Sequence, residues 1–354
     1  MEQLLVFHPF LGGASGYPRG VRTLQKPPDA LLDPATGALR AGSFRGGLPR
    51  VELGALAPRA RERFLQHKRW VYVGIAAGDV FVGAAIVHLG YAANAFAFVY
   101  DKGAGRMLAD RKALGPPLAT RVGDTAGEGM IASARLPGAR LRFERPRGET
   151  MTRIEIELGD VRVFARMDSA GAPPSISAVG PVPGSVGVAT EKRTLLAVSG
   201  EASVGGRRVA LDGGLGGYDY TNGLLPRRTT WRWAFALGRA RTGERVGLNL
   251  VEGMTGEAEC ALWIDGELFP LEEGRFSFDP ARPLDPWRVQ TADGAVDLRF
   301  TPGGMHADRT NLGVIRSRFL QPVGVYSGVI RAPDGRALEL DGVLGVVEDQ
   351  DVLW

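Results

Sequence analysis

The residues most able to do chemistry gather between Leu211 and Gly253. This stretch holds the carboxyl of Asp219, the indoles of Trp231 and Trp233, and several polar side chains. A carboxyl enclosed by apolar residues loses hydration, so its pKa rises and it can donate a proton near neutral pH. We therefore hypothesise that Asp219 is a general acid. The alternative is that Asp219 caps a turn near Asn222 by accepting backbone N–H groups.

Trp231 and Trp233 are two positions apart in a predicted strand, so their side chains point to one face. Two indoles that face a cavity can line an apolar pocket or stabilise a developing cation through their π faces. Packing in the core is the alternative explanation. We predict that both indoles bind substrate.

Three polar side chains in the same stretch are predicted to orient a bound molecule: Tyr218, Asn222 and Asn249. Asn249 stands between two leucines in a predicted strand, and a buried amide must find hydrogen-bond partners. Those partners are a ligand, Glu259 across the sheet, or solvent. All three remain open at this point.

Two further carboxylates are candidates for proton transfer. Glu259 begins an apolar segment and Glu348 follows two valines near the C-terminus. Paired with Asp219, either one would form the two-carboxylate arrangement that glycosidases use. The alternative is that each is a buried carboxylate paired with an arginine.

Other kinds of catalytic site lack their signatures in this sequence. The four histidines form no HxH or HExxH pattern, and the single cysteine, Cys260, excludes cysteine-based metal clusters. The glycines of Gly213–Gly217 precede no predicted helix, which argues against a dinucleotide site. No GxSxG elbow is present. We predict no metal and no cofactor.

The composition is typical of a soluble globular protein with few basic clusters. The chain has 354 residues, 44% hydrophobic and 23% charged, with a net charge of +4. Its densest basic patches are pairs such as Arg227-Arg228, so we predict no nucleic-acid partner. The N-terminus resembles no signal peptide, which predicts a cytoplasmic location. Oligomeric state is not indicated.

Residues 80–100 carry no charge and are long enough to cross a bilayer. They contain Gly83, His88, Gly90 and Asn94 and are rich in β-branched and aromatic residues. We predict two buried strands broken near Gly90 rather than a membrane helix, and no stable membrane insertion.

Short alternating segments separated by tight turns predict an all-β fold. One short helix is expected at Pro58–Lys68, where proline precedes good helix formers. Turns of the Asp-Gly or Thr-Gly kind are expected at 242–243, 265–266, 293–294 and 334–335. Strands are expected at 140–144, 154–158, 161–165, 194–198, 208–211, 230–237, 245–251, 259–264, 289–291, 296–301, 323–330 and 337–343.

This pattern favours two antiparallel barrels or strongly curved sheets after an extended N-terminal segment. We place the segment at 1–60, the first β domain at 61–190 and the second at 191–354. The Pro/Gly/Ser-rich residues 171–187 are the expected crossing between domains. A barrel of about eight strands leaves an interior that holds one small ligand.

Several short motifs together resemble the bacterial proteins called domain of unknown function 2804. The resemblance covers residues 68–354. The motifs are KRW at 68–70, TEK at 190–192, DYTNG at 219–223, TTWRWA at 229–234, GLNLVEG at 247–253, DLRFTP at 297–302 and the terminal GVVEDQDVLW.

That family is similar, more distantly, to proteins of two lipocalin-like barrels, among them carotenoid hydratases, AttH-like proteins and some natural-product cyclases. The resemblance implies a double lipocalin-like fold with a pocket for an apolar small molecule. Family members often carry Asn after the Glu where this chain has Glu259-Cys260, so the resemblance implies no role for position 260.

The hypothesis is therefore a cofactor-independent protein that binds an apolar or amphiphilic small molecule. As an enzyme it would hydrate, isomerise or cyclise an isoprenoid- or polyketide-like substrate, with Asp219 as proton donor. Two alternatives stay open. One is a lipid carrier without chemistry, and the other is a carbohydrate-active enzyme that uses paired carboxylates.

Overall fold

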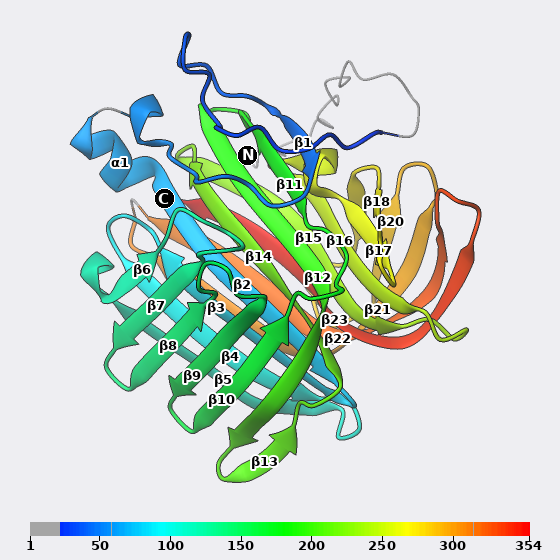
Figure 1. The fold of residues 1–354 in the computed structure, drawn as a ribbon. Coiled ribbons are helices and arrows are strands. Elements are labelled where there is room, and N and C mark those ends of the chain that lie inside the picture. Colours follow the sequence, from blue (N-terminus) through cyan, green and yellow to red (C-terminus); the bar gives the residue numbers. More distant parts are fainter. Residues whose placement is uncertain (1–21, 58, 314) are drawn as a thin grey trace, which may run out of the picture.

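The computed structural model describes residues 22–57, 59–313 and 315–354 and consists mainly of antiparallel strands in two sheets (Figure 1). The one α-helix of this described part is α1 (Ala60–Gln66), and its short 3-10 turns are η1 (Gly54–Leu56), η2 (Pro117–Ala119) and η3 (Gly256–Glu259). No helix among the described residues is long and apolar enough to cross a membrane.

The larger sheet has the order β5-β4-β3-β2-β14-β12-β10-β9-β8-β7-β6; β11 and β13 also pair with β12, and β1 pairs with β11. Its strands are β1 (Gly42–Arg45), β2 (His67–Ala77), β3 (Val80–His88), β4 (Ala93–Asp101), β5 (Arg106–Gly115), β6 (Thr120–Val122), β7 (Ile131–Leu136), β8 (Ala139–Glu144), β9 (Met151–Leu158), β10 (Val161–Asp168), β11 (Ile176–Gly180), β12 (Gly187–Val204), β13 (Arg207–Ala210) and β14 (Gly214–Leu224).

The smaller sheet has the order β18-β17-β16-β15-β23-β22-β21-β20-β19. Its strands are β15 (Arg228–Arg239), β16 (Arg245–Gly253), β17 (Ala261–Ile264), β18 (Glu267–Pro270), β19 (Gly274–Ser277), β20 (Trp287–Thr291), β21 (Val296–Asn311), β22 (Arg316–Arg331) and β23 (Ala337–Leu353). Figure 1 shows this sheet, yellow to red, beside the blue-to-green larger sheet.

Alternation along β2 shows how one strand serves two cores. Val71, Val73 and Ile75 belong to a core enclosed by the larger sheet and by part of the N-terminal segment. Tyr72 and Ala76, on the opposite face, belong to a second core that the larger sheet shares with the smaller one. The two sheets therefore meet through side chains of β2–β4 on one side and β15–β23 on the other.

Glycines let the two sheets approach closely where they pack against each other. We call this contact region the seam. A side chain on Gly217 would meet the Arg193 carbonyl at 2.6 Å and the Phe235 ring at 2.8 Å. Gly74, on the neighbouring strand, faces the same phenyl ring. The glycine-rich residues 213–217 thus mostly form strand β14, and Gly217 among them makes room for Phe235.

Most local predictions are confirmed. The helix forms at α1, although Pro58 lies outside the described residues, as do residues 1–21 of the expected N-terminal segment. Residues 80–100 form β3 and β4, as predicted. The last three strands are longer than predicted: β21 and β23 continue past residues 301 and 343, and β22 begins before residue 323.

The strands do not divide between the sheets at residue 190. That residue lies within β12, and residues 191–224 pair in the larger sheet. The expected crossing at 171–187 contains β11, which pairs with β1 and β12. We take the change of sheet to lie between β14 and β15.

The close approach at Gly217 gives a stability prediction. Gly217→Ala should lower the free energy of unfolding by about 1–3 kcal/mol, because the new methyl overpacks against backbone and a phenyl ring. Urea unfolding followed by tryptophan fluorescence measures the change. Gly266→Ala is the matched control, since a methyl there meets no atom within 4 Å. Equal stabilities for the two variants would show that the seam tolerates the added volume.

Candidate functional site

A cavity of about 370 Å³ lies between the two sheets. The larger sheet contributes residues of β2–β5, β12 and β14, and the smaller sheet contributes residues of β15, β16 and β21–β23. The residues that the following argument uses are Trp70, Tyr72, Asn94, Phe96, Lys192, Asp219, Trp231, Trp233, Glu259, His306, Asp308, Phe319, Gln321, Glu348 and Gln350. The cavity therefore lies at the seam and has walls from both sheets.

Strand register places four of these side chains in one line across the smaller sheet. His306 of β21 stands opposite Gln321 of β22, and Glu348 of β23 stands opposite Trp233 of β15. Gln321 Nε2 donates to Glu348 Oε2 at 2.9 Å, which joins the two pairs. We call His306, Gln321, Glu348 and Trp233 the polar row.

Aromatic rings form much of the cavity wall. The indoles of Trp70 and Trp231 stack at 5.8 Å with an interplanar angle of 11°. Tyr72 meets Trp233 edge to face at 5.2 Å. Both predicted tryptophans therefore lie on the cavity, and each is held by a partner from the other sheet.

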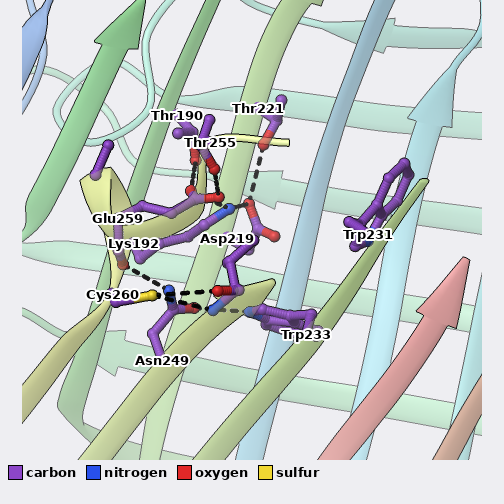
Figure 2. A network of polar contacts seen from close by, with 12 residues as sticks. Thr190, Lys192, Asp219, Thr221, Trp231, Trp233, Asn249, Thr255, Glu259 and Cys260 are labelled. Carbon is purple, nitrogen blue, oxygen red and sulfur yellow. Dashed lines mark hydrogen bonds and ion pairs between the residues drawn. The ribbon is translucent and has the colours of Figure 1, made fainter. Parts of the chain in front are cut away.

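A buried ammonium joins two of the predicted carboxylates (Figure 2). Lys192 Nζ bonds Asp219 Oδ1 and lies 3.2 Å from Glu259 Oε2. Their side chains are only 3%, 11% and 1% exposed. We call these three residues the lysine cluster.

Three threonines complete the lysine cluster. Thr190 donates to Glu259 Oε2 at 2.7 Å, and Thr255 donates to Glu259 Oε1. Thr221 donates to Asp219 Oδ1 at 3.2 Å. Asp219 therefore lies in the middle of β14 and caps no turn, and both Glu259 oxygens are occupied.

The lysine cluster carries one positive and two potential negative charges in a desolvated place. Burial raises the pKa of Asp219, and the neighbouring Lys192 ammonium opposes that rise. The two carboxylates outweigh the effect of burial on Lys192 and hold its pKa above the ordinary value. Lys192 is thus a fixed cation and Asp219 its direct counter-ion.

Glu348 sits on the cavity wall with neutral partners. Trp231 Nε1 donates to Glu348 Oε1 at 2.7 Å, and Gln321 bonds the other oxygen. Burial, reinforced by the nearby Asp219 charge, raises the pKa of Glu348 to about 8. Glu348 therefore holds a proton at neutral pH, and no cation neutralises it directly.

Tyr218 and Asn222 lie on the opposite face of β14 from Asp219. Tyr218 donates to buried Glu191 at 2.5 Å. Asn222 bonds His67 at 2.7 Å and Tyr220 at 3.1 Å. Neither residue lines the cavity, because a strand turns successive side chains to opposite faces.

Asn249 supports the cavity wall from behind. It accepts from Trp233 Nε1 at 2.7 Å and donates to the Glu259 carbonyl at 2.8 Å. Of the three partners left open for Asn249, the structure shows Glu259, bonded through its backbone carbonyl, and Asn249 does not line the cavity. Asn249 fixes the Trp233 ring and the turn that carries Glu259.

Sequence reasoning missed Lys192 and His306 as site residues. Lys192 had a readable signal, because a lysine inside a long β segment needs a buried counter-ion, and Asp219 stands directly opposite it. His306 had little signal, since its partner Asp110 is 196 positions away. Within the described ranges, no group of three or more His, Cys, Asp or Glu could hold a metal ion.

Several solved structures are similar to this chain at low sequence identity. CghA, crystallised with Sch210972, has a TM-score of 0.53 at 11% identity and covers 93% of this chain and 97% of its own. The putative AttH from Nitrosomonas europaea has a TM-score of 0.48 at 13% identity, covering 80% and 92%. Kievitone hydratase from Nectria haematococca has a TM-score of 0.48 at 12% identity, covering 88% and 97%.

The likeness to CghA shows a shared fold, that of double lipocalin-like proteins, which confirms the predicted fold class. No curated protein matches the sequence. The family described as domain of unknown function (DUF2804) matches residues 22–354, which confirms the resemblance carried by the short motifs. This chain belongs to that family.

Proposed function

We propose that the chain binds an amphiphilic small molecule in the cavity and performs cofactor-independent acid–base chemistry on it. The reaction would be a hydration or dehydration, an isomerisation or a cyclisation of an isoprenoid- or polyketide-like substrate. One observation carries this proposal. Glu348, a buried carboxyl with only neutral hydrogen-bond partners, stands on the wall of an aromatic cavity, and burial raises its pKa to about 8.

The cavity fits a ligand with an apolar body. Its volume of about 370 Å³ lies within the range of small-molecule sites. Trp70, Trp231, Trp233, Tyr72 and Phe96 supply flat apolar surface. Isoprenoid chains and polyketides offer the matching shape, with few charges to desolvate.

Buried oxygens along the cavity favour a ligand with hydrogen-bonding groups. Among the described residues, Asn94 Oδ1, Gln321 Oε1 and Gln350 Oε1 are buried without a partner. All three residues line the cavity. A buried acceptor without a donor costs about 1–3 kcal/mol, so a hydroxyl-bearing ligand would recover some of that cost.

Glu348 is a better proton donor than Asp219, to which the sequence analysis gave this role. Asp219 faces an ammonium that favours its ionised form. Glu348 accepts only from neutral N–H groups, and the charge of Asp219 helps it keep its proton. In this proposal burial holds the acid in its protonated state, and the charge of Asp219 adds to that effect.

The polar groups also distinguish this proposal from its alternatives. A lipid carrier needs no buried acid on the pocket wall. A carbohydrate-active enzyme needs two free carboxylates, whereas Asp219 and Glu259 share the Lys192 ammonium. These contacts support acid catalysis by a single carboxylic acid.

Extraction of bound molecules tests the binding step. Native mass spectrometry of the protein purified from its own host should reveal a retained apolar species with oxygen functions. Ala92→Trp should lose it, because Ala92 lines the cavity, half-buried, in the turn between β3 and β4. An empty wild-type protein that also fails to bind an apolar fluorescent probe would contradict the proposal.

Substitution of the acid tests the catalytic step. Glu348→Gln should lower turnover of the identified compound by about 10²–10⁴-fold with little change in its binding, because the amide fills the same space without an acidic proton. Glu339→Gln is the matched control on the same strand, since Glu339 is exposed and paired with Arg241. Undiminished turnover in Glu348→Gln would remove Glu348 from the mechanism.

The raised pKa of Glu348 also predicts a pH dependence of stability. Folding lifts this pKa from 4.5 to about 8, so between these values the folded chain binds a proton that the unfolded chain has lost. Stability conferred by that proton falls as pH rises through this window. The free energy of unfolding of wild type, relative to Glu348→Gln, should therefore decrease from pH 5 to pH 8. Parallel urea-unfolding profiles would show that Glu348 is ionised throughout.

A further inference from the structure

A histidine shares the cavity with Glu348 and stands at the other end of the polar row. His306 is 2% exposed and lines the cavity. Gln321 lies between the two residues, bonded to Glu348 and directly opposite His306 on the neighbouring strand. Two strand spacings place the backbones of His306 and Glu348 about 10 Å apart, which leaves room for a small substrate across the row.

The imidazole of His306 is held in one orientation. Its Nδ1 lies 2.6 Å from Asp110 Oδ1, across the seam on β5 of the larger sheet. The ring stacks on Phe96 with centroids 4.2 Å apart and meets Phe319 edge-on at 5.7 Å. These contacts fix the ring plane from both sheets.

The aspartate also fixes the tautomer. An ionised carboxylate only accepts hydrogen bonds, so Nδ1 carries the hydrogen and donates it to Asp110. The lone pair then lies on Nε2, which bonds to no other described residue. An oriented imidazole with a free Nε2 lone pair is the usual form of a histidine general base.

The two other acidic residues on this part of the cavity wall, Asp308 and Glu348, have partners of their own. Asp308, two positions along β21, pairs with Lys112 of β5 at 2.6 Å. Glu348 is separated from His306 by Gln321. His306 therefore has Asp110 as its one carboxylate partner within the described part of the chain.

We propose that His306, positioned by Asp110, is a general base that works with the acid Glu348 in the same cavity. The inference rests on the proposed function and specifies its substrate class. A base and an acid at separate ends of one row match the reversible loss of water from a β-hydroxy carbonyl compound. The adjacent carbonyl makes the C–H bond acidic enough for an imidazole.

In the direction of dehydration, one proton leaves carbon and one proton reaches the departing hydroxyl. His306 Nε2 takes the proton from the carbon next to the carbonyl, and the C–H electron pair forms the carbon–carbon double bond. The bond from the neighbouring carbon to the hydroxyl oxygen breaks, and Glu348 gives its proton to that oxygen to release water. The imidazolium then returns its proton to the Glu348 carboxylate through water. Hydration is the reverse.

A probe reaction tests the base without knowledge of the natural substrate. In 5-nitrobenzisoxazole a base removes the ring C–H proton, the electron pair forms a nitrile, and the N–O bond breaks to release a coloured nitrophenolate. The full-length protein should accelerate this release above the rate given by the same concentration of free imidazole. His306→Gln should lose about 10²-fold of the protein's rate, because a general base contributes about that much.

Matched variants separate a catalytic from a structural role. His88→Gln is the control, since His88 is half-buried and does not line the cavity. Its rate should equal that of wild type. His306→Ala should regain activity with added imidazole, which a merely structural loss would not allow. Asp110→Asn should lower the rate less than His306→Gln does, because it frees the tautomer without removing the base.

Binding of the probe distinguishes failure of this inference from failure of the proposed function. The nitro compound should quench the cavity tryptophans, and Ala92→Trp should weaken that binding. Quenching without accelerated release, or equal release by wild type and His306→Gln, overturns the role of His306 and leaves the binding cavity standing. Absence of binding overturns both proposals.

Discussion

A buried ammonium at the seam of the two sheets constrains the rest of the site. Lys192 comes from β12, Asp219 from β14, and Glu259 from the turn before β17. Removing one member of such a buried group leaves an uncompensated charge, at a cost of about 3–5 kcal/mol. Because the three residues come from both sheets, the lysine cluster fixes how the sheets meet. Because the cavity lies between the two sheets, its shape depends on that contact.

The charges of the lysine cluster also affect the group that can act as an acid. With Lys192 paired to Asp219 and Glu259, a further ionised carboxylate nearby would add negative charge to a place without water. Burial raises the pKa of Glu348 to about 8, and the charge of Asp219 in the lysine cluster adds to that rise. Stability and proposed reactivity here come from one electrostatic arrangement.

Sequence reasoning identified the β segments, most of the turns and the stretch around Asp219, because these depend on local alternation and turn chemistry. Sequence reasoning could not determine which side chains point to which face in a strand that is buried on both faces. In β14, Tyr218 and Asn222 point into the core of the larger sheet, whereas Asp219 points to the cavity. When both faces have apolar neighbours, the polar–apolar alternation that indicates side-chain direction is lost.

The polar row shows the second limit, which is long-range pairing. His306, Gln321 and Glu348 lie outside the strands predicted at 296–301, 323–330 and 337–343, and only the register of β21–β23 aligns them. Asp110 then reaches His306 from the other sheet. An acid and an oriented imidazole in one aromatic chamber are therefore a product of sheet register. A shift by one residue would turn both away from the cavity, so the long strands that fix this register are as much part of the site as the groups they present.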